Sequence, residues 1–109
     1  MASYITAVTD RYALGGADAM YPFLEEHIKQ NCTREAFVQG VSREPRPTAY
    51  RALKAVSFQD DDRYPGGTAE AKVDFITQQG DIERTWKVAQ MADSTWRLVK
   101  IPGMDACPA

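Results

Sequence analysis

The stretch Thr68–Ile101, TAEAKVDFITQQGDIERTWKVAQMADSTWRLVKI, decides the fold of this chain. It contains three strand-like runs, two turns and both tryptophans. Every second residue from Ala69 to Phe75 is apolar and the residues between them are charged, which is the period of a strand with one buried face. We therefore predict an antiparallel meander whose inner face is formed by Val73, Phe75, Trp86 and Val88.

The charges also suggest how the second hairpin of this meander is paired. A two-residue turn at Gly80–Asp81 places Phe75 opposite Trp86, with opposite charges facing each other on the other side. A turn at Gln79–Gly80 would instead place two lysines directly opposite each other, which is unfavourable. We therefore predict the turn at Gly80–Asp81.

The last strand is apolar on both sides, because Trp96 and Leu98 point one way while Val99 and Ile101 point the other. Strands of this kind are usually covered on both faces. We therefore predict a homodimer in which a second copy of the chain covers the outer face of the sheet.

The N-terminal third has the pattern of helices. Apolar residues from Ile5 to Tyr12 recur at spacings of three and four, and Gly15–Gly16 is expected to end this first helix. Asp18 is the expected N-cap of a second helix, which continues to Ile28.

Thr33 is the expected N-cap of a third, short helix, and Gly40 is expected to end it. The proline-rich segment Ser42–Pro47 predicts a linker. A first strand is predicted at about Tyr50–Gln59, followed by a surface loop over residues 60–67.

The length of 109 residues predicts a single α+β domain, helical over residues 1–41, a sheet over 49–102 and a C-terminal tail over 103–109. Its net charge of -2 argues against nucleic acid as a partner, because nucleic-acid binding favours a basic patch. No apolar run approaches the roughly 20 residues needed to span a bilayer, so we expect no membrane span.

Helices followed by a twisted antiparallel meander resemble the nuclear-transport-factor-2-like (cystatin-like) superfamily, and in particular small bacterial domains found on secreted or lipid-anchored proteins. The resemblance rests on Gly16-Ala17-Asp18 before Tyr21, Cys32-Thr33-Arg34-Glu35-Ala36-Phe37, Trp86-Lys87-Val88 and Ser94-Thr95-Trp96-Arg97-Leu98. It implies a curved sheet around the first helix with a conical cavity between them. Members of the superfamily use this cavity as an enzyme site, as a small-molecule pocket or as core.

Five residues are candidates for the lining of such a cavity. Tyr4, Tyr12 and Tyr21 would place hydroxyls at its mouth, and Trp86 would form an aromatic wall suited to a small, flat, apolar ligand. Arg84 lies on the same strand face as Trp86 and is a candidate to hold an anionic group at the rim. The other interpretation is that the aromatic residues fill the core and that Arg84 extends into solvent.

Isomerase-like or dehydratase-like chemistry needs a carboxylate or histidine inside the cavity. His27, the single histidine, lies in the polar run EEHIKQN, on the expected exposed side of its helix. Glu70 and Asp74 fall on the strand face opposite Val73, so no acid is predicted to point inward. The run Asp60–Asp62 lacks the spacing of a calcium loop, and we expect no metal and no cofactor.

Cys32 and Cys107 leave two interpretations open. A disulfide between them would close a long loop, stabilise the chain by about 4 kcal/mol and indicate an oxidising compartment. Two free thiols would carry no such information. An extracytoplasmic location is favoured if the cysteines are bonded, and a cytoplasmic one otherwise.

The sequence therefore favours a non-catalytic ligand-binding or protein-binding module. The alternative is a small cavity enzyme, isomerase-like or dehydratase-like, that acts on an apolar molecule. A third possibility is a partner-docking domain that uses a sheet face. An acid and a tyrosine within hydrogen-bond reach inside an open cavity would favour the enzyme, whereas a closed or wholly apolar cavity would argue against it.

Overall fold

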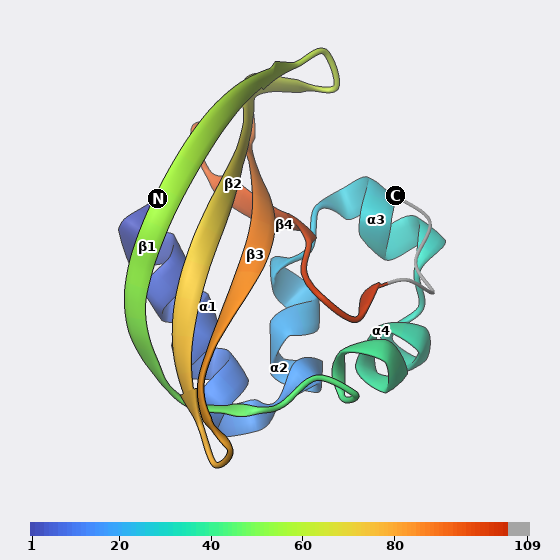
Figure 1. The fold of residues 1–109 in the computed structure, drawn as a ribbon. Coiled ribbons are helices and arrows are strands. Elements are labelled where there is room, and N and C mark those ends of the chain that lie inside the picture. The colour runs from blue at the N-terminus through green and yellow to red at the C-terminus, as the bar shows by residue number, and fades with distance from the viewer. Residues whose placement is uncertain (105–109) are drawn as a thin grey trace.

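The computed structural model describes residues 1–104 and has the predicted α+β fold (Figure 1). The helical elements are α1 (Ala2–Gly15), α2 (Ala17–Met20), the 3-10 helix η1 (Tyr21–Phe23), α3 (Glu26–Asn31) and α4 (Arg34–Val41). The strands β1 (Pro47–Asp61), β2 (Tyr64–Thr77), β3 (Gly80–Gln90) and β4 (Trp96–Lys100) form one antiparallel sheet in the order β1-β2-β3-β4. This arrangement is compatible with a nuclear-transport-factor-2-like fold.

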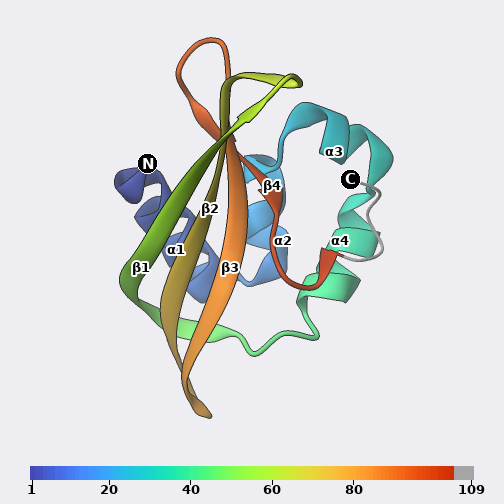
Figure 2. The ribbon, with the colours of Figure 1, turned by 45° about the horizontal axis from the view of Figure 1, so that its top comes forward.

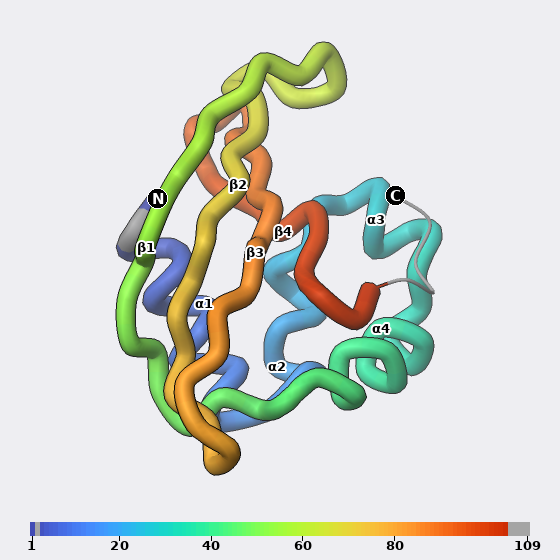
Figure 3. The backbone as a smooth tube through the Cα atoms, viewed as in Figure 1, coloured from blue at the N-terminus to red at the C-terminus, as the bar shows by residue number. Residues whose placement is uncertain are grey.

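The sheet is long and curved, and α1 packs against one of its faces (Figure 1). The helices α3 and α4 lie to the side of the sheet, beyond β4, as a second view confirms (Figure 2). The backbone tube shows that the two hairpin turns of β1–β2 and β2–β3 lie at opposite ends of the sheet (Figure 3). These two ends are therefore separate surfaces of the molecule.

Bulges in β1 produce much of this curvature. The β1–β2 register shifts between Tyr50 and Ala52 and again between Leu53 and Ala55, so β1 has extra residues relative to β2. A bulge bends its strand and increases the local twist. As a result Tyr50, Leu53 and Val56 all pair with inner-face residues of β2, although they are spaced by three.

The register predicted for the β2–β3 hairpin is wrong. Phe75 pairs with Ile82, four residues before the predicted partner Trp86, and the turn is formed by residues 78–79. The Thr77 side chain accounts for this turn, because its hydroxyl donates to the Gly80 carbonyl at 2.6 Å and accepts from the Gln79 amide at 3.1 Å. Gly80 has a φ of 114°, which a residue with a side chain rarely adopts.

The predicted inner face is confirmed despite this register error. Side chains alternate between faces with a period of two, so a shift by four residues returns each of them to the same face. Val73 and Val88 are fully buried, and Phe75 and Trp86 are 2% exposed with ring centroids 5.5 Å apart. This face forms the core together with the buried residues of α1.

The predicted second helix is wrong, because it is broken into α2, η1 and α3. Asp18 lies in the first turn of α2 and does not cap it. The break occurs at Leu24, whose backbone is extended and forms a parallel bridge with Leu98 of β4. The amide of Glu25 also donates to the Leu98 carbonyl at 2.9 Å. A continuous helix could not offer these backbone groups to β4.

The third helix begins as predicted but continues further. The Thr33 hydroxyl accepts from the Ala36 amide at 3.1 Å, which confirms the N-cap. Gly40 was expected to end the helix, yet α4 continues to Val41. Gly40 instead permits close packing, because a Cβ atom there would lie 2.0 Å from the carbonyl oxygen of Gly103.

The predicted loop over residues 60–67 is also wrong, because β2 already begins at Tyr64. Tyr64 is buried, which draws the chain back into the sheet directly after the turn. Gly67 has a φ of 77°, and a Cβ atom there would meet the Gln59 carbonyl at 2.6 Å. Gly67 therefore lies where the backbones of β1 and β2 approach each other closely, and not in a loop.

The outer face of the sheet is charged. Arg51 of β1 lies 3.6 Å from Asp74 and also pairs with Asp81, and Lys54 lies 3.2 Å from Glu83. Within a single copy of the chain, Val99 is 7% exposed and Ile101 2%. The burial of β4 on both faces is thus explained without a second copy, and the homodimer stays a prediction.

Two further sequence expectations concern the cysteine pair and a membrane span. Cys32 follows α3 and is 3% exposed, whereas Cys107 lies outside the described residues, so their pairing stays a prediction. No helix within residues 1–104 is long and apolar enough to cross a membrane.

Candidate functional site

A small cavity of about 20 Å³, which we call the notch, lies between the inner face of β2 and β3, the helix α1 and the segments that follow α4 and β4. This volume is about that of one water molecule, so the interior expected to be a conical pocket is largely filled by core. The notch brings together three of the five candidate residues, with prolines around them: it is lined by Tyr12, Val41, Glu44, Pro45, Pro47, Phe75, Ile82, Arg84, Trp86, Ile101 and Pro102.

Arg84 reaches the notch from the inner face of β3, where it pairs with Val73 of β2. Its Nε atom donates to the Glu44 carboxylate at 2.6 Å, and the two side chains are 31% and 28% exposed. The anionic group that was expected beside Arg84 is therefore present in the chain itself. Glu44 lies in the segment predicted as a linker, where no residue pattern indicated an inward-facing acid.

Tyr12 contributes a buried ring to the notch from α1. Burial, and secondly the nearby Glu44 carboxylate, raise the pKa of its phenol above the ordinary value. The phenol therefore stays neutral at physiological pH, where it can donate or accept a hydrogen bond but does not act as a phenolate base.

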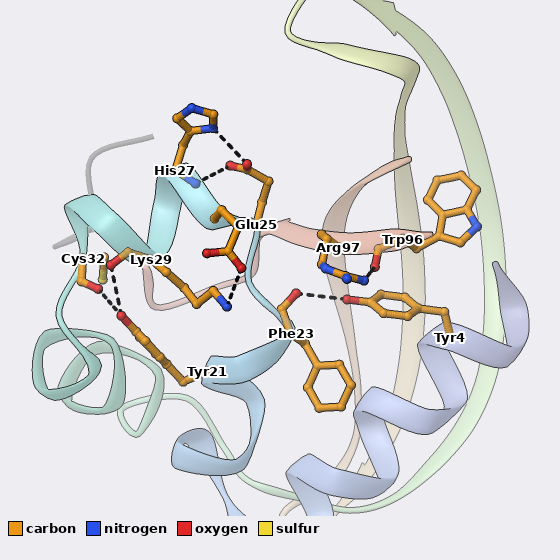
Figure 4. Close-up of polar contacts among 10 residues, drawn as sticks. Tyr4, Tyr21, Phe23, Glu25, His27, Lys29, Cys32, Trp96 and Arg97 are labelled. Atoms are coloured by element: carbon orange, nitrogen blue, oxygen red, sulfur yellow. Dashed lines mark hydrogen bonds and ion pairs between the residues drawn. The ribbon is translucent and has the colours of Figure 1, made fainter. Parts of the chain in front are cut away.

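The other two candidate tyrosines do not line the notch, and their hydroxyls contact backbone carbonyls (Figure 4). The Tyr4 hydroxyl donates to the Phe23 carbonyl at 3.1 Å, and burial raises its pKa to about 12. The Tyr21 hydroxyl donates to the carbonyls of Cys32, at 2.6 Å, and Lys29, at 3.1 Å. Both hydroxyls hold helical segments together, so the structure does not place them in a common pocket with Trp86.

A wider groove of about 460 Å³ adjoins the notch and shares Pro45 and Pro47 with it. Its lining is mostly polar, and none of its residues was singled out from the sequence: Ala13, Pro45, Arg46, Pro47, Thr48, Gln78 and Gln79. Arg46 is held in place by a 2.9 Å hydrogen bond to the Ala13 carbonyl. We call this surface the polar groove.

A second polar site lies where Glu25 caps α3, at the break that sequence analysis missed. The Glu25 side chain is 5% exposed and accepts from the His27 amide at 3.1 Å and from His27 Nδ1 at 3.0 Å (Figure 4). The Tyr64 hydroxyl lies 3.4 Å from the same carboxylate. A pocket of about 380 Å³ opens beside these three residues, and we call it the histidine pocket.

Burial acts to raise the pKa of Glu25, but hydrogen bonds from the backbone and ring of His27 outweigh it, and the pKa lies below its ordinary value. Glu25 is therefore an ionised carboxylate at neutral pH. Burial and the Glu25 charge raise the pKa of the neighbouring Tyr64 phenol. His27 itself is 84% exposed, as its position in the sequence suggested.

The sequence of this chain matches no known protein-family model, and no curated protein is significantly similar to it.

Proposed function

We propose that this chain is a protein-binding module whose notch and polar groove have no catalytic role. Its partner contributes an extended peptide segment that lies in the polar groove and inserts the methyl-sized tip of one apolar side chain into the notch. The observation that supports this proposal is the continuity of the two surfaces through Pro45 and Pro47. A small apolar anchor site beside a larger polar groove matches the side chain and backbone of a peptide.

The size of the notch argues for a side chain over a whole small molecule. Small-molecule sites are usually clefts of about 300–1,000 Å³ that enclose most of the ligand. The free space in the notch is about 20 Å³. Trp86 and Phe75 provide its apolar floor, and the two shared prolines form a rim of restricted backbone freedom.

The polar groove offers groups that suit a peptide backbone. The side-chain amides of Gln78 and Gln79 are exposed at the β2–β3 turn, and each amide can both donate and accept hydrogen bonds. Neither side chain forms a hydrogen bond with another described residue. They are therefore available to the alternating amide and carbonyl groups of an extended segment.

Exposed apolar side chains also border this end of the molecule. Leu14, next to the groove residue Ala13, is 82% exposed, and Ile76, two residues before Gln78, is 38% exposed. Single exposed apolar residues are common on surfaces. Leu14 follows a residue that lines the polar groove, so a partner segment lying there would cover it, whereas Ile76 lies on the outer face of the sheet.

A cavity enzyme receives less support from the same geometry. The acid in the notch, Glu44, already accepts a hydrogen bond from Arg84, and it forms none with Tyr12 among the described residues. Catalysis by proton transfer would require this ion pair to open first. A small apolar ligand in the notch also receives less support, because the free volume of the notch is only about 20 Å³.

Membership of the nuclear-transport-factor-2-like superfamily is part of the proposal, supported by the order of helices and strands. A homodimer through the outer sheet face has less support, because that face is lined by ion pairs. An extracytoplasmic location follows if Cys32 and Cys107 are bonded. Mass measurement of the protein with and without reduction and alkylation tests that bond.

Selection from a displayed random-peptide library tests the binding proposal. Bound peptides are expected to share one apolar anchor residue, and Ile82→Ser in the notch is expected to weaken them strongly. Phe58→Ser is the matched control, because Phe58 is 69% exposed but lies towards the opposite end of the sheet, on β1. The proposal fails if no selected peptide distinguishes these two variants.

A further inference from the structure

We propose that His27 is a nucleophile held in position by Glu25, and that the histidine pocket takes an activated acyl compound that transfers its acyl group to His27 Nε2. This inference concerns the side of the molecule formed by α3 and the start of β2. It involves none of the residues of the notch or the polar groove, so it stands or fails independently of the proposed peptide binding.

The hydrogen bond from His27 to Glu25 decides which ring nitrogen carries the proton. The Glu25 carboxylate is ionised and can only accept hydrogen bonds. His27 Nδ1, 3.0 Å away, must therefore be the protonated nitrogen. In the neutral ring the other nitrogen, Nε2, is then unprotonated, and its lone pair is free for attack or for accepting a proton.

Glu25 is well suited to hold the ring in this state. Its side chain is 5% exposed, and one carboxylate oxygen is occupied by the His27 amide at 3.1 Å and by the Tyr64 hydroxyl at 3.4 Å. These contacts fix the carboxylate independently of the ring. An acid that orients a histidine, which in turn presents its free nitrogen to a substrate, is the arrangement found in nucleophilic catalysis.

The free nitrogen has room for a substrate. The ring of His27 is 84% exposed and lines the pocket of about 380 Å³, and its Nε2 atom forms no hydrogen bond with any described residue. Figure 4 shows the ring with Nδ1 directed at Glu25 and with no contact drawn to the other nitrogen. Ile28 and the ring of Tyr64 supply apolar surface to the same pocket.

Arg63 supplies the donors that an acyl group needs as its carbonyl oxygen gains charge. Its Nε and Nη2 atoms donate to Asp61 at 3.2 and 3.1 Å, and its guanidinium lies 5.7 Å from the centre of the Tyr64 ring. A guanidinium has five N–H groups, so two bonds to Asp61 leave three for another acceptor. Asp61 thus holds Arg63 in place without using all of its donors.

The chemical step is a simple acyl exchange. The lone pair of Nε2 attacks the acyl carbon, the bond from that carbon to the leaving oxygen breaks, and the leaving group departs with its electron pair. The resulting acyl-imidazolium is positively charged and lies against the Glu25 carboxylate through its Nδ1 proton. Water then attacks the acyl carbon and the bond to Nε2 breaks, which releases the carboxylic acid and restores the neutral ring with Nδ1 protonated; the second proton of the water passes to the departed leaving group or to solvent. No oxidant, reductant or metal is needed.

A purely structural role for Glu25 predicts different behaviour. As a helix cap alone, Glu25 needs only the His27 amide, and the ring would have no preferred tautomer or reactivity. The chain offers a matched control in Glu26, which is one residue further on, 71% exposed and paired with Lys29. Removing the charge of Glu26 leaves the contacts of the His27 ring unchanged.

Acetylation by p-nitrophenyl acetate tests the proposal on the full chain. The chain has one histidine, so mass spectrometry can separate an acetyl group on His27 from acetyl groups on lysines. We expect His27 to be acetylated first, and nitrophenolate release to fall at least about tenfold in His27→Gln and in Glu25→Gln, but not in Glu26→Gln. Acetylation confined to lysines, or an unchanged rate in His27→Gln, overturns the proposal.

Nitrogen NMR of the single histidine provides a second test that needs no variant. The proposal requires the neutral ring to carry its proton on Nδ1 and to have Nε2 free. Observation of the Nε2-protonated tautomer, or of an equal mixture, overturns it even if Glu25→Gln fails to fold. His27→Gln is expected to fold normally because the ring is mostly exposed, which keeps the kinetic comparison valid.

Discussion

The notch and the histidine pocket are built in different ways, and they were not equally visible in the sequence. The inner face of the sheet contributes Phe75, Ile82, Arg84 and Trp86 to the notch, and there a period of two assigns side chains to a face even when the register is wrong. The histidine pocket depends on a break between helical segments, where its central acid, Glu25, is buried and donates its backbone amide to Leu98 of β4. Periodicity reveals a face but does not reveal a break that tertiary pairing imposes.

The two sites also use their acids differently. Glu44 at the notch is partly exposed and neutralises Arg84 at close range. Glu25 is buried and is stabilised by hydrogen bonds from the residue that it orients, His27. Glu44 therefore forms part of the rim of the notch, whereas Glu25 orients the ring of His27. The following predictions test this difference, beginning with the largest expected effect.

Trp86→Ala tests whether the notch is the edge of a packed core. The ring is 2% exposed and lies 5.5 Å from Phe75, so its removal is expected to lower the free energy of unfolding by about 3–5 kcal/mol. Urea denaturation followed by circular dichroism measures the change. Phe58→Ala, on an exposed residue, is the control and should cost less than about 0.5 kcal/mol. A loss below about 1 kcal/mol for Trp86→Ala would mean that the ring is not core.

Glu25→Gln tests whether the buried acid is stabilising in its ionised form. We expect a loss of about 1.5–3 kcal/mol at neutral pH, because a hydrogen-bonded buried charge is replaced. The pKa of Glu25 is below its ordinary value of 4.5, so its contribution is complete above that pH and is lost as the pH falls through the lower value in the folded protein.

The stability difference between the wild type and Glu25→Gln should therefore shrink below about pH 4. Urea midpoints at pH 7 and pH 3 measure this change, and Glu26→Gln serves as the exposed control. A difference that grows towards acid pH would show that Glu25 is protonated in the native protein.

Gly40→Ala tests the close contact between α4 and the segment after β4, which borders the notch through Val41 and Pro102. A Cβ atom at Gly40 would lie 2.0 Å from the Gly103 carbonyl oxygen, and the backbone would have to move. The expected loss is about 1–3 kcal/mol, measured by thermal or urea unfolding. Gly80→Ala separates backbone strain from contact: no described atom lies within 4 Å of the position its Cβ would take, but its φ of 114° is unfavourable for alanine, so any loss there reports the backbone conformation alone.

A double-mutant cycle on Glu44 and Arg84 tests the rim of the notch. The two side chains are about 30% exposed, so their coupling energy is expected to be about 1 kcal/mol or less, and to decrease at high salt. Urea unfolding of the two single variants and the double variant gives this energy. A coupling energy that is large and independent of salt would contradict the description of Glu44 and Arg84 as a partly exposed ion pair at the rim of the notch.

Much of the fold could be predicted from the sequence, but less of the sites. The alternation around Val73, the cap at Thr33 and the helix end at Gly15–Gly16 depend on local chemistry, and the structure has all three. The β2–β3 turn was predicted at the wrong residues because the prediction used only the charges of facing strand residues. The turn is closed by a hydrogen bond from the Thr77 hydroxyl to the Gly80 carbonyl.

The remaining misses are contacts between distant segments. The role of Gly40 depends on Gly103, and the backbone amide of Glu25 donates to Leu98, so neither contact can be read from neighbours in the sequence. The polar groove likewise joins the end of α1, the segment before β1 and the β2–β3 turn. A more local signal existed for Glu25, since an acid two residues before a histidine can cap a helix and contact the ring.

Chemical-shift mapping with a library-selected peptide tests the central claim, peptide binding at the notch and the polar groove, most directly. Titration of the labelled protein is expected to shift backbone resonances of residues 44–48 and 78–84, and the indole resonance of Trp86, while leaving the single histidine unchanged. Shifts concentrated at residues 25–28 and 63–64, or spread over the charged outer face of the sheet, would contradict the claim.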